Sequence, residues 1–103
     1  MNISKDLLNK MPKLYDQEEV NDPIVYIRFF TRDNMQWFAT EFDGEDTFFG
    51  ICDLNMDWPE LGYFSLSEFV EVNENMSLPK IIIDESFKPT SLSEVKKLYD
   101  ICL

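Results

Sequence analysis

The residues of this sequence that are best suited to chemistry are carboxylates. Four of them, Glu41, Asp43, Glu45 and Asp46, lie close together around Gly44. Paired carboxylates can hydrolyse glycosidic bonds, and the oxygen-rich stretches DGED and DLNMD contain ligands that Ca²⁺ prefers. Neither stretch has the spacing of a dedicated calcium loop, and the four acids fit a hairpin turn and its shoulders better. We therefore predict no catalytic residue, no metal site and no cofactor.

Other catalytic groups are missing or isolated. The sequence contains no histidine, which excludes histidine-based triads, dyads and metal sites. Gly44, Gly50 and Gly62 form no phosphate-binding loop. Cys52 and Cys102 lack the spacing of a metal site, and we expect both to be buried free thiols. The sequence therefore predicts a binding protein rather than an enzyme.

The net charge of −11 lies entirely in the middle of the chain. Residues 33–79 contain eleven acids and no base, whereas residues 1–32 contain five of each and residues 80–103 four of each. Like charges close together repel one another, and nothing about folding requires so many acids without a base. A solvated, solubilising face is the simpler interpretation. We favour the alternative, that the asymmetry marks a functional surface.

Composition also excludes some partners. The nine Lys and Arg residues are too few for binding to a phosphate backbone, and an anionic membrane surface is disfavoured for the same reason. No apolar run approaches the ~20 residues of a membrane span, and MNISKDLLNKMPK lacks the apolar region of a signal peptide. We expect one cytoplasmic domain, residues 1–103, in a monomer or dimer.

Three stretches have the β-branched and aromatic composition of strands. They are IVYIRFFTR (24–32), MQWFATEF (35–42) and TFFGICDL (47–54). Asp33-Asn34 and Asp43-Gly44 supply turns between them, which predicts an antiparallel meander. Both faces of these strands carry large apolar groups, so either helices cover both faces or part of an aromatic face binds a partner.

Capping signals predict the helices. Ser4 is a candidate N-cap for a helix that ends near Pro12, and Ser65-Leu66-Ser67-Glu68 and Ser91-Leu92-Ser93-Glu94 have capping-box spacing. Short strands are expected at 62–64 and 81–84. The C-terminal helix is expected to bury one stripe: Leu92, Val95, Leu98, Tyr99 and Cys102. The predicted fold class is α+β, an antiparallel β-sheet meander with two or three short helices packed on it.

The two tryptophans have different expectations. Trp37 lies in a predicted strand and is expected in the core. Trp58, in the stretch WPELGY, either covers the core beneath a loop or anchors in a pocket of a partner, as Trp and Tyr often do at interfaces.

The chain resembles a family known as a domain of unknown function, number 2958. The resemblance rests on TEFDGEDTFFG (40–50) and PELGYFSLSE (59–68), and it extends through DPIVYIRFFT (22–31), Leu78-Pro79 and FKPTSLSEV (87–95), over roughly residues 12–95. Its members are typically small acidic proteins of bacterial plasmids, conjugative elements and phage-like islands, with no established activity. They usually carry a basic residue in the strand after Leu-Pro, where this chain has KIIIDESF.

The resemblance changes the functional expectation. Mobile elements encode small acidic proteins that occupy the nucleic-acid sites of host defence nucleases, because spaced carboxylates imitate phosphates. We therefore expect an inhibitor of anti-CRISPR or anti-restriction type that binds a basic protein surface rather than nucleic acid. The alternative is a regulatory module of the same element, which binds through an aromatic patch around Trp58 and Tyr63.

One band of residues is predicted to make the contact. Because Asp43, Glu45 and Asp46 lie at a turn tip, we expect their reversal to lysine to leave the fold intact and to abolish binding. The predicted partner-binding residues are Glu41, Asp43, Glu45, Asp46, Asp53, Asp57, Trp58, Glu60 and Tyr63.

Overall fold

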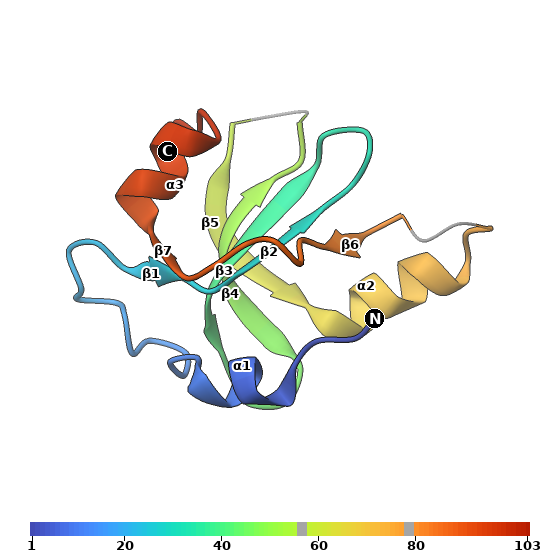
Figure 1. The fold of residues 1–103 in the computed structure, drawn as a ribbon, viewed down its shortest axis with the longest axis horizontal. Helices are drawn as coiled ribbons and strands as arrows, with labels where there is room; N and C mark the ends of the chain where they lie inside the picture. The colour runs from blue at the N-terminus through green and yellow to red at the C-terminus, as the bar shows by residue number, and fades with distance from the viewer. Residues whose placement is uncertain (56–57, 78–79) are drawn as a thin grey trace.

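A computed structural model describes residues 1–55, 58–77 and 80–103 of the chain (Figure 1). The elements follow one another in the order α1 (Lys5–Lys10), β1 (Ile24–Val25), β2 (Ile27–Phe30), β3 (Gln36–Phe42), β4 (Thr47–Asp53), β5 (Glu60–Ser65), α2 (Leu66–Glu74), β6 (Ile82–Ile83), β7 (Thr90–Ser91) and α3 (Leu92–Leu98).

The predicted α+β fold and its antiparallel meander are confirmed. The main sheet has the order β5-β4-β3-β2-β6, with every neighbouring pair antiparallel. The first predicted strand is divided at Tyr26 into β1, which pairs with β7, and β2, which pairs with β3. The short strand expected at 62–64 is the central part of the longer β5, which forms one edge of the sheet.

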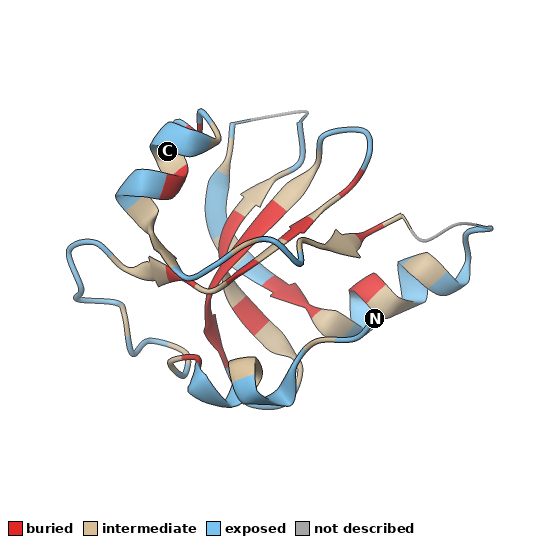
Figure 2. Cartoon of the chain, viewed as in Figure 1, coloured by how far each residue is buried: buried red, intermediate tan, exposed pale blue. Residues whose placement is uncertain are grey.

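Helices cover both faces of the sheet, as one of the two alternatives predicted. On one face, Phe29 packs against Phe69 of α2, with ring centroids 5.1 Å apart. The buried Trp37 of β3 belongs to the same cluster, and so does Met11, the residue that follows α1. On the other face, Val95 of α3 joins Phe38 and Ile51 in a second cluster. Figure 2 shows the buried residues along the strands, between the helices.

The capping signals predicted all three helix starts. Ser4, Ser65 and Ser91 are the N-caps of α1, α2 and α3, and each hydroxyl accepts a hydrogen bond from the backbone three residues later. These bonds satisfy N–H groups that would otherwise lack a partner in the first helical turn.

A distant aspartate reinforces each of the two Ser-Leu-Ser-Glu caps. Asp46 accepts hydrogen bonds from the backbone N–H and the hydroxyl of Ser67, at 2.8 and 2.6 Å. Asp22 accepts the same pair from Ser93, at 2.9 and 2.7 Å. The hydrogen bonds to Ser93 lower the pKa of Asp22. The two Ser-Leu-Ser-Glu sequences therefore form the same hydrogen-bonded structure. One fixes α2 to the β3–β4 turn, and the other fixes α3 to the loop before β1.

The predicted stripe of α3 is wrong at its last turn. Val95 is buried, but Leu98 is 64 % exposed and Cys102 is exposed as well. The helix ends at Leu98, and the positive φ of Asp100 (54°) turns the chain so that Ile101 packs into the core instead. The prediction of two buried thiols fails for Cys102 for this reason.

The other cysteine, Cys52, is partly buried. Cys52 lies on β4, and burial, followed by the nearby charge of Glu60, raises its pKa to about 11. A thiol with so high a pKa is a poor nucleophile at neutral pH.

A β-bulge interrupts the pairing of β3 with β4. Ala39 is opposite Gly50 and Glu41 is opposite Phe49, so Thr40 is the extra residue. Strand alternation alone would place Glu41 on the same face as Trp37 and Ala39. The bulge turns it to the opposite face.

The bulge requires a glycine on the neighbouring strand. A Cβ added to Gly50 would lie 1.8 Å from the carbonyl oxygen of Phe38. We expect Gly50→Ala to lower the free energy of unfolding by about 3 kcal/mol, because backbone must move to relieve the contact. Gly62→Ala is the matched control, since its Cβ would meet only Cys52 Sγ at 3.8 Å. Urea unfolding of both variants checks this, and equal stabilities would contradict it.

Candidate functional site

Glu41 does not belong to the predicted surface band, because it is only 4 % exposed. Its two carboxylate oxygens accept hydrogen bonds from the backbone N–H groups of Tyr15 and Gln17, at 2.8 and 2.7 Å. The bulge directs the side chain to this position. Glu41 therefore holds the loop between α1 and β1 against the sheet, and it is not available to a partner.

Gln17 completes the attachment of this loop. Its side-chain amide donates to the carbonyl groups of Ile24 and Thr40, and its side-chain oxygen accepts from the N–H of Ile24. The loop is polar in sequence, and the structure gives it a fixed position through these contacts.

Two acids at the tip of the β3–β4 turn also stabilise the fold through hydrogen bonds. One oxygen of Asp43 accepts hydrogen bonds from the N–H groups of Glu45, Asp46 and Thr47, and these bonds lower the pKa of Asp43. Asp46 caps α2 through Ser67. The premise that turn-tip residues contribute little to the fold is therefore wrong for Asp43 and Asp46. Glu45 is exposed beside them.

Two of the remaining predicted acids, Asp53 and Glu60, lie toward the other end of β4. Asp53 is partly buried and accepts hydrogen bonds from Gln36 and Asn55. Glu60 is exposed at the start of β5. Asp57 lies outside the described residues. The described acids of the β3–β4 turn and of the next connection thus lie toward opposite ends of β4, as expected for a meander.

The structure instead joins the β3–β4 turn to α2. The bond between Asp46 and Ser67 places the turn beside the first residues of the helix, and three further acids of α2 are exposed. We call this surface the acidic ridge; it consists of Asp43, Glu45, Asp46, Glu68, Glu71 and Glu74.

The three glutamates of α2 were not among the predicted partner-binding residues. The signal was present, since Glu68, Glu71 and Glu74 recur every third residue after a recognised helix start. The helix rise places them ~4.5 Å apart along its axis, compared with ~3.4 Å between charges of one B-DNA strand.

Two of the three acids of α2, Glu71 and Glu74, are at positions that a helix disfavours, whereas Glu68 lies in the first turn. α1 and α3 carry an acid in the first turn and a base in the last, which complements the helix dipole. α2 has no base in its last turn, and Glu74 is its final residue. Like charges three residues apart also destabilise a helix. Local stability therefore does not explain the charges of Glu71 and Glu74.

A second exposed surface is apolar. Trp58 is 78 % exposed, so the expectation that it covers the core is wrong. Leu61 and Tyr63 of β5 are 52 % and 54 % exposed. They lie two residues apart, on one face of a strand at the edge of the sheet.

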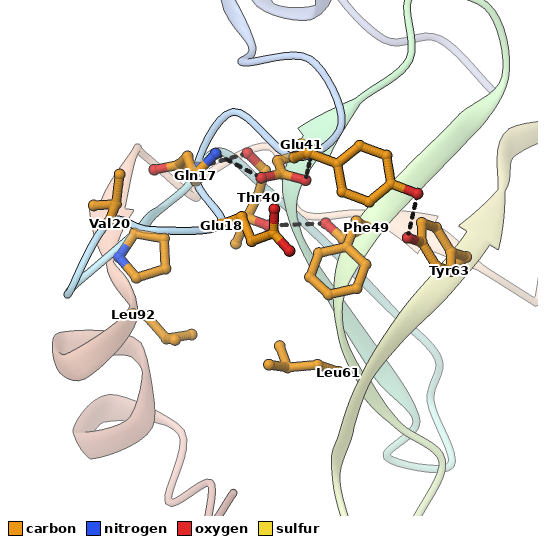
Figure 3. Close-up of a pocket in the computed structure, with 11 residues that line it drawn as sticks. Gln17, Glu18, Val20, Thr40, Glu41, Phe49, Leu61, Tyr63 and Leu92 are labelled. Atoms are coloured by element: carbon orange, nitrogen blue, oxygen red, sulfur yellow. Dashed lines mark hydrogen bonds between the residues drawn. The ribbon is translucent and has the colours of Figure 1, made fainter.

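A groove lies next to Leu61 and Tyr63 (Figure 3). It separates the loop between α1 and β1 from strands β4 and β5, and its volume is about 420 Å³. The hydroxyl of Tyr63 donates to that of Tyr15 across one side, at 3.2 Å. The groove is lined by Tyr15, Gln17, Glu18, Val20, Pro23, Thr40, Glu41, Phe49, Leu61, Tyr63 and Leu92.

Comparison with known proteins identifies a family but no function. The family described as "Protein of unknown function (DUF2958)" matches residues 2–98. No curated protein and no solved structure matches the chain.

Among the residues that the structure describes, no group of three or more Cys, Asp or Glu side chains is arranged to hold a metal ion. None of the helices there has the length and apolar character needed to cross a membrane.

The role of Glu41 can be tested by removing its charge. We expect Glu41→Gln to lower the free energy of unfolding by about 2 kcal/mol, because the new amide N–H₂ faces a backbone N–H and one charged hydrogen bond is lost. Glu45→Gln, at the exposed turn tip, should change it by less than about 0.5 kcal/mol. Chemical denaturation of the two variants checks this. A stability for Glu41→Gln equal to that of the parent would show that Glu41 does not hold the loop.

Proposed function

The chain belongs to the DUF2958 family, and we infer that it is a non-enzymatic binding protein whose acidic ridge contacts a basic surface of a protein partner. One observation carries this inference: Glu71 and Glu74 lie in the half of α2 where a helix favours bases, while α1 and α3 follow the usual pattern. Because these two negative charges destabilise the helix that carries them, we expect them to serve binding to a partner.

The partner that fits this surface best is an enzyme that processes nucleic acid. Carboxylates at intervals of a few ångströms along a rigid helix imitate a phosphate backbone and attract the groove that normally holds it. The chain itself is acidic, with a net charge of −11, so a direct complex with nucleic acid is disfavoured. We propose that it competes with nucleic acid for the partner's basic groove.

The family resemblance, which implies an origin in plasmids or phage-like islands, supports a more specific proposal. In this proposal a mobile element encodes the protein, which acts in the cytoplasm against a host defence nuclease. A CRISPR effector and a restriction enzyme both have basic grooves for nucleic acid, and the acids of the ridge do not choose between them.

A second function is supported by the exposed apolar residues. Trp58 and Tyr63 are large, exposed side chains of the kind that anchor protein interfaces. In this alternative the protein is a regulatory module that binds another protein of the same element through these residues. Capture of binding partners from host cells separates the alternatives: a nucleic-acid-processing enzyme supports inhibition, and an element-encoded protein supports regulation.

The ridge can be tested by a variant that should stabilise the fold and abolish function. Glu71→Lys with Glu74→Lys places bases in the second half of α2, so we expect the free energy of unfolding to rise by about 0.5 kcal/mol. The same change should abolish inhibition of the target nuclease, measured as phage survival in cells that carry the defence system.

The matched control changes the net charge equally at another place. Glu19 and Glu85 are exposed outside the ridge, so Glu19→Lys with Glu85→Lys should retain inhibition. Loss of inhibition by both double variants would show that net charge alone matters. Full inhibition by the Glu71→Lys, Glu74→Lys variant would contradict the proposed role of the ridge.

A further inference from the structure

The groove beside Tyr15 and Tyr63 is shaped by features that are unfavourable in isolation. The bulge at Thr40 interrupts the ladder of β3 and β4. Tyr15 has a positive φ of 73°, a conformation that is strained for a residue with a side chain. The carboxylate of Glu41 is buried and holds the N–H of Tyr15. Together these features place the ring of Tyr15 opposite Tyr63.

The walls of the groove combine apolar surface with negative charge. Phe49, Leu61 and Leu92 contribute apolar surface, and the exposed carboxylate of Glu18 lines the opening. Figure 3 shows Glu18 on one side of the opening, with Leu61 and Leu92 on the other. All eleven described residues that line the groove are uncharged or acidic.

The hydroxyl of Tyr63 lies near two of the carboxylates of this region, Glu41 and Glu18. Its pKa is raised, first by the hydrogen bond to Tyr15, then by burial and by the negative charges around it, which include Glu41 and Glu18. A negative potential beside aromatic rings favours a cation.

The same molecule shows how such surroundings hold a guanidinium. The guanidinium carbon of Arg28 lies 4.7 Å from the ring centres of Phe30 and Tyr99. Its Nη1 also donates to Asp84 at 3.0 Å. Nε and Nη2 donate to the side-chain oxygen of Gln36, at 3.1 and 3.0 Å. Within this fold an arginine is thus held by aromatic faces, one carboxylate and one amide oxygen.

We propose that the groove binds the side chain of an arginine from the protein partner. The groove offers two of the kinds of group that surround Arg28, aromatic rings in Phe49 and Tyr63 and a carboxylate in Glu18. Leu61 and Leu92 would contact the aliphatic part of the side chain. Arginine fits better than lysine because its planar guanidinium stacks on aromatic rings and is more weakly hydrated.

This inference rests on the proposed function only in that the arginine belongs to the partner. A basic groove for nucleic acid contains many arginines, and the acidic ridge and the arginine groove would contact different ones. Binding of the groove to arginine can nevertheless be measured without the partner.

The experiment is a titration of ¹⁵N-labelled protein with Nα-acetyl-arginine N-methylamide, followed by NMR. We expect saturable shifts of the amide signals of Glu18, Phe49, Leu61 and Tyr63. Glu18→Gln should weaken binding by about threefold to fivefold, as expected for a partly solvated ion pair. Glu19→Gln is the matched control, because Glu19 is also exposed but does not line the groove, and its affinity should equal that of the parent.

The corresponding norleucine and lysine amides define what would overturn the proposal. Absence of shifts at the solubility limit of the arginine probe would overturn it, and so would equal binding of the norleucine probe, since the groove would then be only apolar. Equal binding of the lysine probe would overturn the choice of arginine. The Glu71→Lys, Glu74→Lys variant should bind the arginine probe unchanged, so failure of the ridge and failure of the groove are distinguishable.

Discussion

The fold must accommodate eleven acids between residues 33 and 79 without a base in that segment. It does so in three ways. Glu41 is buried against backbone N–H groups. Asp43 and Asp46 cap a turn and a helix. Most of the other described acids are exposed, and Asp33 forms an ion pair with Lys80, which lies just outside the segment, at 3.9 Å. The buried acid attaches the α1–β1 loop to the sheet, the two capping acids stabilise the β3–β4 turn and the start of α2, and exposed acids contribute to the acidic ridge.

The bulge in β3 determines where the buried Glu41 lies, and through it the shape of the nearby surface. By placing Glu41 opposite Phe49, it brings a buried carboxylate to the face where the α1–β1 loop crosses the sheet. The loop is then fixed over β3, and its other end is tied to α3 through Asp22 and Ser93. The groove between the loop and β5 is a consequence of these attachments. One extra residue in a strand therefore determines a surface feature formed by several distant segments.

Much of the fold was predictable because its signals are local. β-branched and aromatic composition located the strands, and Ser4, Ser65 and Ser91 located the helix starts. The end of α3 was not predictable in the same way, because the positive φ of Asp100 interrupts the apolar periodicity after Leu98. The family was also recognised from the sequence, and its match extends over residues 2–98.

The candidate site was harder to predict because it depends on contacts that are distant in sequence. Glu41 and Glu45 look alike in the sequence, and only the register of β3 with β4 shows that one is buried and the other exposed. Asp46 joins the turn to α2 across 21 residues, which adds Glu71 and Glu74 to the acidic surface. The charge asymmetry itself was visible in the sequence, but its shape was not.

The central claim is that the acidic ridge occupies a site that otherwise binds nucleic acid. The most direct test is the affinity of this protein for its captured enzyme partner, measured with and without an excess of that enzyme's own nucleic-acid substrate. We predict competition, in which the substrate weakens the apparent affinity in proportion to its concentration and the Glu71→Lys, Glu74→Lys variant does not bind. A ternary complex, in which the protein binds with unchanged affinity while the nucleic acid remains bound, would contradict the claim.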